Sequence, residues 1–262
     1  MTKTVLITGA TTGIGYELSK LFAKDKYDLI ITARSESKLK EVSEKLSKEF
    51  SVNVKFITKD LAKSGAAKEL YEEVKNEKKN IDIDILVNNA GFGTHGSFGG
   101  SDPDTDLEMI QLNVTSLVAL TKFFLNDMIK INSGKIMNVA STAAFQPGPM
   151  MAIYYATKSF VLSFSEAIDE ELSDTKISVT AFCPGPTKTE FQVRAGIKNT
   201  KLVNKGFSSM MSAEEAARAG YHGLMKGKRI VIPGLMNKVF PQLIRFSPRN
   251  LVTKAVRFIH KE

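Results

Sequence analysis

The stretch "TGATTGIG" at residues 8–15 ends an apolar run, "KTVLIT" at residues 3–8, and leads directly into a helical pattern, "IGYELSKLFAKDK". Gly9 permits a tight turn, Gly13 lets the backbone approach a ligand, and Gly15 allows a helix to pack closely on a strand. A glycine turn before a helix N-terminus, whose N–H groups are free, can hold a pyrophosphate. The spacing G-x-x-x-G-x-G is a variant of the common dinucleotide fingerprint, and a glycine turn without a ligand is the alternative reading.

The alternation of short β-branched runs with helical periods continues along the chain. After residues 3–8, the pattern predicts strands at 27–33, 51–57, 82–88, 135–140, 176–183 and 229–233. It predicts further helices near 105–131, 152–174 and 212–226, the last of them opened by the capping box Ser212-x-x-Glu215. Strands that alternate with helices indicate βαβ units. We therefore predict a Rossmann-like, doubly wound α/β sheet of seven mainly parallel strands with helices on both faces.

Composition and charge narrow the class of protein. Nothing in the 262 residues reads as a linker, so we expect one dinucleotide-binding and catalytic domain over 1–262. A strand begins almost at once, no apolar run could span a bilayer, and Cys183 is the single cysteine. We expect a cytoplasmic protein. The chain has 36 basic and 28 acidic residues. Nine of the basic residues and one of the acidic residues lie in 226–262, so 27 of each kind remain in the rest of the chain. The net charge of +8 therefore comes from the tail.

The tail at about 234–262 is a basic amphipathic extension. After Pro248, the apolar residues Leu251, Ala255 and Ile259 recur every four positions, with Arg and Lys beside them. Such a helix packs on its own domain, packs on a partner subunit, or lies on an anionic membrane. We favour packing on protein. Nucleic acid is not expected as a partner, because the aromatic residues do not form a stacking platform.

The end of the second predicted strand indicates which nucleotide is preferred. A chain that binds NAD places an acidic residue here, on the ribose 2′-hydroxyl. This chain has Arg34, whose guanidinium can fork onto a 2′-phosphate, with Ser35 and Lys38 nearby. We predict NADP(H) over NAD(H). A solvated Arg34, with Glu36 on the ribose hydroxyl, is the alternative.

Tyr154 and Lys158 lie four residues apart, on one face of a predicted helix. A nearby ammonium favours the phenolate, so we expect Lys158 to lower the pKa of Tyr154 and make it an acid–base group. Tyr155, with Ser159 at the same spacing, gains no such partner. Ser141, at the end of the strand "KIMNVAS", could bind a substrate oxygen or cap a loop. Asn113, on an apolar stripe, is either a structural hydrogen bonder or part of a water relay.

Together these residues resemble the short-chain dehydrogenase/reductase family in its single-domain form. The resemblance covers nearly the whole chain, and Ser141 and Tyr154 have the 13-residue separation usual in that family. Its motifs are "TGATTGIG", "NNAG" at 88–91, Asn113, Ser141, "YYATK" at 154–158 and "PGPTKT" at 184–189.

The resemblance implies a role for each matched residue. Tyr154 would exchange a proton with the substrate oxygen, Lys158 would lower its pKa and bind the nicotinamide ribose, Ser141 would position the carbonyl, and Asn113 would hold a relay water. It also implies a homo-oligomer, a dimer or tetramer. The expected cofactor contacts, besides Tyr154, Lys158 and the residues at the second strand, are Gly9, Thr11, Gly13, Ile14, Gly15, Asp60, Leu61, Asn89, Ala90, Gly91 and Thr187.

A second glycine pattern, "GFGTHG" at 91–96, matches G-x-G-x-x-G letter by letter but leads into more loop. We expect Gly91 to support the central sheet and the rest to be a loop over the active-site mouth. His95, His222 and His260 are far apart and form no metal motif, so no metal is expected. The segments 142–153 and 190–211, with Phe191, Phe207, Met210 and Met211, would flank the substrate or fill ordinary core.

We therefore expect an NADP(H)-dependent oxidoreductase that interconverts a carbonyl and an alcohol, with a substrate that has an apolar body. The opposing hypothesis is a non-catalytic NADP(H)-binding regulator or scaffold with the same fold, which has no need of Ser141, Tyr154 and Lys158 together. A third is a lipid-surface protein that acts mainly through its basic tail. The identity of the substrate and the direction of reaction do not follow from the sequence.

Overall fold

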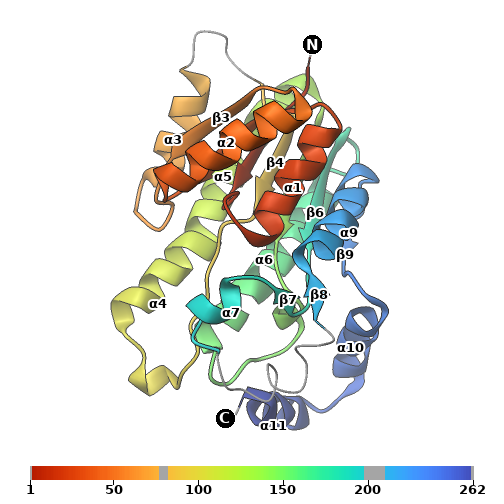
Figure 1. Ribbon diagram of the computed structural model, residues 1–262. Helices are drawn as coiled ribbons and strands as arrows, with labels where there is room; N and C mark the ends of the chain where they lie inside the picture. The colour runs from red at the N-terminus through yellow and green to blue at the C-terminus, as the bar shows by residue number, and fades with distance from the viewer. Residues whose placement is uncertain (1, 77–81, 198–209, 261–262) are drawn as a thin grey trace.

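The computed structural model describes residues 2–76, 82–197 and 210–260. In this part of the chain, seven strands form one sheet in the order β3-β2-β1-β4-β5-β6-β9, with every neighbouring pair parallel (Figure 1). The predicted doubly wound α/β sheet is confirmed. The strands are β1 (Thr4–Thr8), β2 (Asp28–Ala33), β3 (Val54–Thr58), β4 (Ile85–Asn88), β5 (Gly134–Val139), β6 (Ile177–Phe182) and β9 (Ile230–Val231).

Helices cover both faces of the sheet because successive strand residues point to opposite sides. Val5 and Ile7 of β1 pack against α1, α2 and α9, whereas Leu6 packs in the core formed with α3 and α5. Helix α6 lies on this second face, where it packs against β6. The helices are α1 (Gly13–Lys24), α2 (Glu36–Phe50), α3 (Ala66–Lys75), α4 (Pro103–Ile110), α5 (Leu117–Ile131), α6 (Ala152–Glu171), α7 (Phe191–Arg194) and α9 (Ala213–Met225).

Several predicted boundaries differ from the structure. The single helix expected at 105–131 consists of α4, the π-helical turn η2 (Gln111–Ser116) and α5. Strand β3 begins at Val54 rather than at 51, because Ser51 adopts a left-handed φ of 54° and ends α2. The short segments are η1 (Phe98–Gly100), η3 (Thr142–Phe145) and the two-stranded pair β7 (Thr187–Lys188) and β8 (Met211–Ser212).

The C-terminal segment forms α10 (Leu235–Phe246) and α11 (Arg249–His260), which lie at the end of the molecule opposite the N-terminus (Figure 1). The sequence predicts that α11 packs through Leu251, Ala255 and Ile259, and this prediction is wrong by one position. The buried row is Val252, Val256 and His260, and Leu251 is exposed. Within the described residues, no helix has the length and apolar character needed to cross a membrane.

The sheet order places a crevice where a ligand can bind. The chain builds β1, β2 and β3 outward in one direction and then returns to add β4 on the other side of β1. At such a reversal, the loops after the two central strands diverge and leave a crevice at the carboxyl ends of the strands. The glycine loop after β1 and the "NNAG" segment after β4 both reach this point.

Candidate active site

The loop between β1 and α1 has the geometry of a phosphate cradle. Gly9 and Gly13 adopt left-handed φ values of 67° and 57°, and a Cβ on Gly15 would lie 2.3 Å from the carbonyl oxygen of Gly9. Glycine is therefore required for the turn and for close packing. The N-cap residue Thr12 makes no side-chain cap bond, and the first turn of α1 carries no acidic residue. Its N–H groups remain available to an anionic phosphate, so the loop fits a dinucleotide.

The crevice holds a cavity of about 530 Å³ that extends from this loop to the start of α6. It brings together residues from most motifs of the sequence analysis. Two predicted residues, Gly15 and Asn113, are not in its wall. The predicted residues in the wall are Gly9, Thr11, Gly13, Ile14, Arg34, Ser35, Lys38, Asp60, Leu61, Asn89, Ala90, Gly91, Ser141, Tyr154, Lys158 and Thr187.

The "NNAG" segment joins the glycine loop to the centre of the sheet. The side-chain amide of Asn89 donates to the carbonyl oxygens of Thr8 and Gly9, at 2.9 and 3.0 Å. The hydroxyl of Thr8 accepts from the backbone N–H groups of Asn89 and Ala90. These bonds hold the ends of β1 and β4 together at the cavity floor. This agrees with the supporting role expected for the segment.

Asn113 is fully buried behind the cavity, in the π-helical turn η2. Its side chain accepts from the N–H of Phe92 and donates to the carbonyl oxygen of Phe92 and to Oγ1 of Thr157. The amide therefore fastens the "GFGTHG" loop to α6. Its structural hydrogen bonds are present in the structure, and its part in a proton relay stays a prediction.

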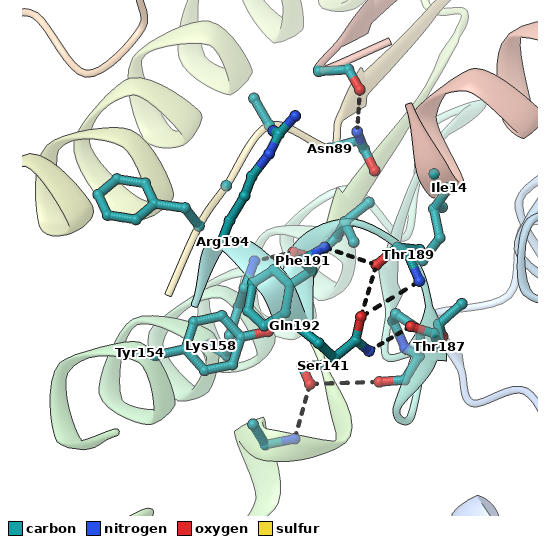
Figure 2. A pocket seen from close by; sticks show the side chains of 18 of the residues that line it. Ile14, Asn89, Ser141, Tyr154, Lys158, Thr187, Thr189, Phe191, Gln192 and Arg194 are labelled. Carbon is teal, nitrogen blue, oxygen red and sulfur yellow. Dashed lines mark hydrogen bonds between the residues drawn. The ribbon is translucent and has the colours of Figure 1, made fainter. Parts of the chain in front are cut away.

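Ser141, Tyr154 and Lys158 lie on one side of the cavity (Figure 2). Lys158 Nζ is 5.8 Å from the centre of the Tyr154 ring and donates to the carbonyl oxygen of Val139 at 2.7 Å. Ser141 Oγ accepts from the N–H of Ala143 at 3.1 Å and so caps η3. Ser141 is thus a loop cap that also faces the cavity, and its binding of a substrate oxygen stays a prediction.

The environment of these groups changes their acidity in a direction that the sequence did not indicate. Burial raises the pKa of Tyr154 to about 12, and the neighbouring Ser141 hydroxyl offsets only part of this rise. Burial lowers the pKa of Lys158 to about 8. Desolvation of the phenolate dominates the pKa of Tyr154 here, and the expected lowering of that pKa by Lys158 stays a prediction.

The segment after β6 folds over the cavity. The ring of Phe191 lies 5.2 Å from the Tyr154 ring, and Gln192 donates to the carbonyl oxygen of Thr187 at 2.6 Å (Figure 2). Thr189 reaches the phosphate loop, since its Cγ2 would be 3.1 Å from a Cβ on Gly13. Thr187–Arg194 therefore connects the two ends of the cavity.

Comparison of the sequence with models of known protein families identifies the family of this chain. A sequence model described as "short chain dehydrogenase" matches residues 3–199. The chain belongs to the short-chain dehydrogenase/reductase family. It is an oxidoreductase fold with a nucleotide-binding loop, as the sequence motifs predict.

Two curated relatives are similar to this short-chain dehydrogenase. An uncharacterized oxidoreductase, YvrD, of Bacillus subtilis is 37% identical over 72% of this chain and 70% of its own length. The very-long-chain 3-oxoacyl-CoA reductase of Rattus norvegicus is 31% identical over 96% of this chain and 80% of its own length. Among solved structures, a short-chain dehydrogenase from Sphingobium yanoikuyae in complex with NADPH has a TM-score of 0.81 and 30% identity, and covers 94% of this chain and 97% of its own.

The tail of this short-chain dehydrogenase closes the far end of the cavity, which the sequence analysis missed. Val256, Ile259 and His260 of α11 line the wall. His260 is buried, and its Nε2 lies 2.7 Å from the hydroxyl of Tyr155. Tyr155 thus has a hydrogen-bond partner 105 positions away, which the sequence analysis did not foresee. No local pattern could indicate this contact.

His95 of the "GFGTHG" loop joins the same cluster. Its Nε2 lies 3.1 Å from the carbonyl oxygen of His260, and its N–H donates to the carbonyl oxygen of Ala195. The loop also approaches Tyr154, since a Cβ on Gly93 would lie 2.8 Å from that ring. It therefore lies at the active-site mouth, as expected. Among the described residues, no group of three or more His, Cys, Asp or Glu side chains is placed to hold a metal ion.

Proposed function

We propose that this short-chain dehydrogenase uses NADP(H) to interconvert a carbonyl and an alcohol on a substrate with an apolar body. The observation that carries the proposal is the convergence of Ser141, Tyr154 and Lys158 in the cavity that also contains the phosphate loop. A nucleotide-binding regulator needs the loop but not these three side chains at the opposite end. Their placement therefore supports catalysis.

The side chains divide the chemistry between them. When bound, the nicotinamide cofactor supplies or accepts a hydride. In reduction, Ser141 Oγ donates a hydrogen bond to the carbonyl oxygen and orients it. Tyr154, whose pKa is about 12, keeps its proton at neutral pH and donates it to that oxygen. Lys158, still mostly an ammonium at pH 7 with a pKa of about 8, stabilises the phenolate that is left.

The proposal keeps Asn113 in a proton relay with Lys158. Both side chains border Gly91, since a Cβ there would lie 2.9 Å from Asn113 Oδ1 and 3.4 Å from Lys158 Nζ. The relay would return a proton to Tyr154 after each turnover. The hydrogen bonds of Asn113 to Phe92 and Thr157 would keep it in place during the cycle.

The preference for NADP(H) rests on the end of β2. Arg34, Ser35 and Lys38 line the cavity there, whereas Glu36 is not in its wall. Two cationic side chains and a hydroxyl suit a 2′-phosphate, and no acidic residue of this segment faces the ribose position. The similar Sphingobium yanoikuyae dehydrogenase, whose structure contains NADPH, adds support.

The preference for an apolar substrate rests on the wall beyond Tyr154. Met151, Phe191, Met210, Phe240 and Val256 line this part of the cavity. Met211 instead packs against the core beside α9, and Phe207 lies outside the described residues. Because apolar walls favour an apolar ligand, long ketones or 3-oxoacyl thioesters are the first substrates to test. The name of the Rattus norvegicus relative is consistent with this choice.

The test of catalysis is NADPH consumption over a panel of ketones, aldehydes and 3-oxoacyl thioesters. Tyr154→Phe should lower kcat roughly 10²–10⁴-fold, the usual contribution of a general acid, while NADPH binding measured by fluorescence titration is retained. Tyr71→Phe, on α3 away from the cavity, is the matched control and should keep full activity.

Two results would contradict the proposal. Equal turnover by Tyr154→Phe and the unmodified protein would remove Tyr154 as the acid. Tight NADPH binding without turnover of any carbonyl in the panel would favour the non-catalytic regulator. Faster reduction of small polar carbonyls than of long apolar ones would overturn only the substrate class.

The cofactor preference has its own test, the ratio of NADPH to NADH affinities. Arg34→Ala should lower this ratio about tenfold or more, because it removes a charge-assisted bond to the 2′-phosphate. Lys40→Ala, an exposed cation on the same helix α2 but outside the cavity wall, should leave the ratio unchanged. An unchanged ratio in Arg34→Ala would show that the guanidinium does not read the phosphate.

A further inference from the structure

The surface of α10 carries an unusual set of exposed apolar side chains. Five large apolar residues of this helix are between 43% and 85% exposed to solvent, where ordinary surface helices place polar groups. They are Leu235, Met236, Val239, Leu243 and Phe246.

These residues form one sector of the helix. At 100° per residue, the five positions fall within an arc of about 100° on the helical wheel. On the opposite side of α10, Pro241 is buried and Asn237 lines the cavity, while Phe240, beside Met236 on the wheel, both lines the cavity and is 42% exposed. The helix is thus apolar on an outer face as well as on its inner face. Packing of α10 against the rest of the chain explains the apolar residues of the inner face but not those of the outer face.

Cationic side chains lie to one side of this apolar sector on α10, and acidic ones are absent from α10 and α11. On the wheel, Lys238 and Arg245 lie about 60° and 80° beyond the Leu235 edge of the sector, past Gln242, and α11 adds Arg249, Lys254 and Arg257. All five are exposed, and neither α10 nor α11 contains an Asp or Glu. Exposed apolar residues bordered by Lys and Arg suit a surface that is apolar below and anionic above, as a lipid bilayer with anionic headgroups is.

We propose that α10, with the basic residues of α11, docks this protein on an anionic lipid surface. The apolar sector enters the boundary between headgroups and acyl chains, and the five cations contact lipid phosphates. A second copy of the chain would bring the same five cations face to face, which disfavours self-association through this surface. The exposed position of Leu251 on α11 adds to the apolar area at this end of the molecule.

The docking also has a consequence that rests on the proposed function. Phe240 of α10 and Val256 of α11 belong to the cavity wall, so the lipid-facing helices are also walls of the substrate site. An apolar substrate dissolved in the bilayer would have a short path into the cavity. The docking itself is tested without turnover, so a failure of one proposal is distinguishable from a failure of the other.

The test is co-sedimentation of the full chain with phosphatidylcholine vesicles that contain about one third phosphatidylglycerol. We expect binding that weakens at high salt and is at least about tenfold weaker on phosphatidylcholine alone. Phe246→Ser should weaken binding about tenfold through lost apolar contact, and Arg245→Ser about fivefold through lost charge. Ile129→Ser, which removes an exposed apolar residue at the end of α5, is the matched control and should bind like the unmodified chain.

Three outcomes would overturn the proposal: no binding to anionic vesicles, equal binding to neutral and anionic vesicles, or loss of binding in Ile129→Ser to the same extent as in Phe246→Ser. Analytical ultracentrifugation without vesicles tests the alternative that a second copy of the chain covers this face. A dimer that Phe246→Ser converts to monomer, in a chain that does not bind vesicles, would assign the face to a second copy.

Discussion

At the residue scale, the reactive groups of this short-chain dehydrogenase owe their properties to burial. Tyr154 and Lys158 lie four residues apart on α6, and the same desolvation moves their pKa values apart, that of Tyr154 up to about 12 and that of Lys158 down to about 8. Burial favours the neutral form of each group. The phenol therefore holds its proton firmly, and the ammonium holds its proton loosely.

This difference predicts a pH profile for carbonyl reduction. The value of kcat/KM reports the free enzyme, so it should be level below about pH 8 and fall above it as Lys158 loses its charge. The tyrosine, with a pKa of about 12, should add no further loss below pH 10. The measurement is the initial rate of NADPH oxidation from pH 6 to pH 10.

Lys158→Arg is the matching variant, because a guanidinium keeps its charge over the whole range. Its rate is expected to be lower, since the side chain is larger and its contact with the carbonyl oxygen of Val139 would change. The fall above about pH 8 should nevertheless disappear. A profile of the unmodified enzyme that stays flat up to pH 10 would contradict the lowered pKa of Lys158.

At the element scale, α11 is held against the cavity by a buried row of Val252, Val256 and His260, of which only the histidine is polar. His260 contacts Tyr155 of α6 and His95 of the "GFGTHG" loop, and no hydrogen bond of its Nδ1 is found within the described residues. Burial, with a smaller contribution from His95, lowers the pKa of His260 to about 4. The helix is thus anchored by a neutral imidazole.

Acid should therefore loosen α11. A histidine whose folded pKa lies below its unfolded value of about 6.5 contributes stability that is complete above pH 6.5 and is lost as the pH falls toward 4. We expect the amides of α11 to exchange hydrogen several-fold faster at pH 5 than at pH 7, after correction for the intrinsic rates. Hydrogen exchange measured by mass spectrometry follows this directly.

His260→Gln, whose side chain does not titrate, should remove the difference between the two pH values. Exchange in α3, which contacts neither His260 nor Tyr155, should be unaffected in both proteins. If α11 of the unmodified chain is equally protected at pH 5 and pH 7, the histidine does not anchor the helix.

At the scale of the whole molecule, a buried polar network joins the two central strands to the helices on one face. The amide of Asn88 on β4 donates to Oδ1 of Asn138 on β5 and to Oγ1 of Thr121 on α5. The amide of Asn138 donates to Oγ of Ser165 on α6. Because both strands end at the cavity, this network also aligns "NNAG" with Ser141.

Removal of one member should destabilise the protein as a whole. Asn138→Ala leaves the Asn88 amide without one acceptor and Ser165 without its donor, which costs about 1–3 kcal/mol for each unsatisfied group. We expect Tm to fall by roughly 2–4 °C for every kcal/mol, as measured by calorimetry. Glu44→Ala, an exposed change on α2, should shift Tm by less than about 1 °C.

Much of the fold and part of the site follow from the sequence. The seven strands of a parallel sheet, the glycine loop and the capping box at Ser212 depend on neighbours close in the chain, and the structure has all of them. Residue types that allow a left-handed φ, or that alternate along a strand, act locally and can be read directly. The placement of Ser141 beside Tyr154 also follows, because strand ends of a parallel sheet meet at one edge.

The sequence by itself determined the parallel sheet, the phosphate loop and the residue types of the candidate site. Only the tertiary structure decided which row of α11 is buried, that His260 contacts Tyr155 across 105 positions, and that burial raises the pKa of Tyr154. The physical reason is that desolvation and packing depend on every segment that surrounds a side chain. Periodicity describes only the segment to which it belongs.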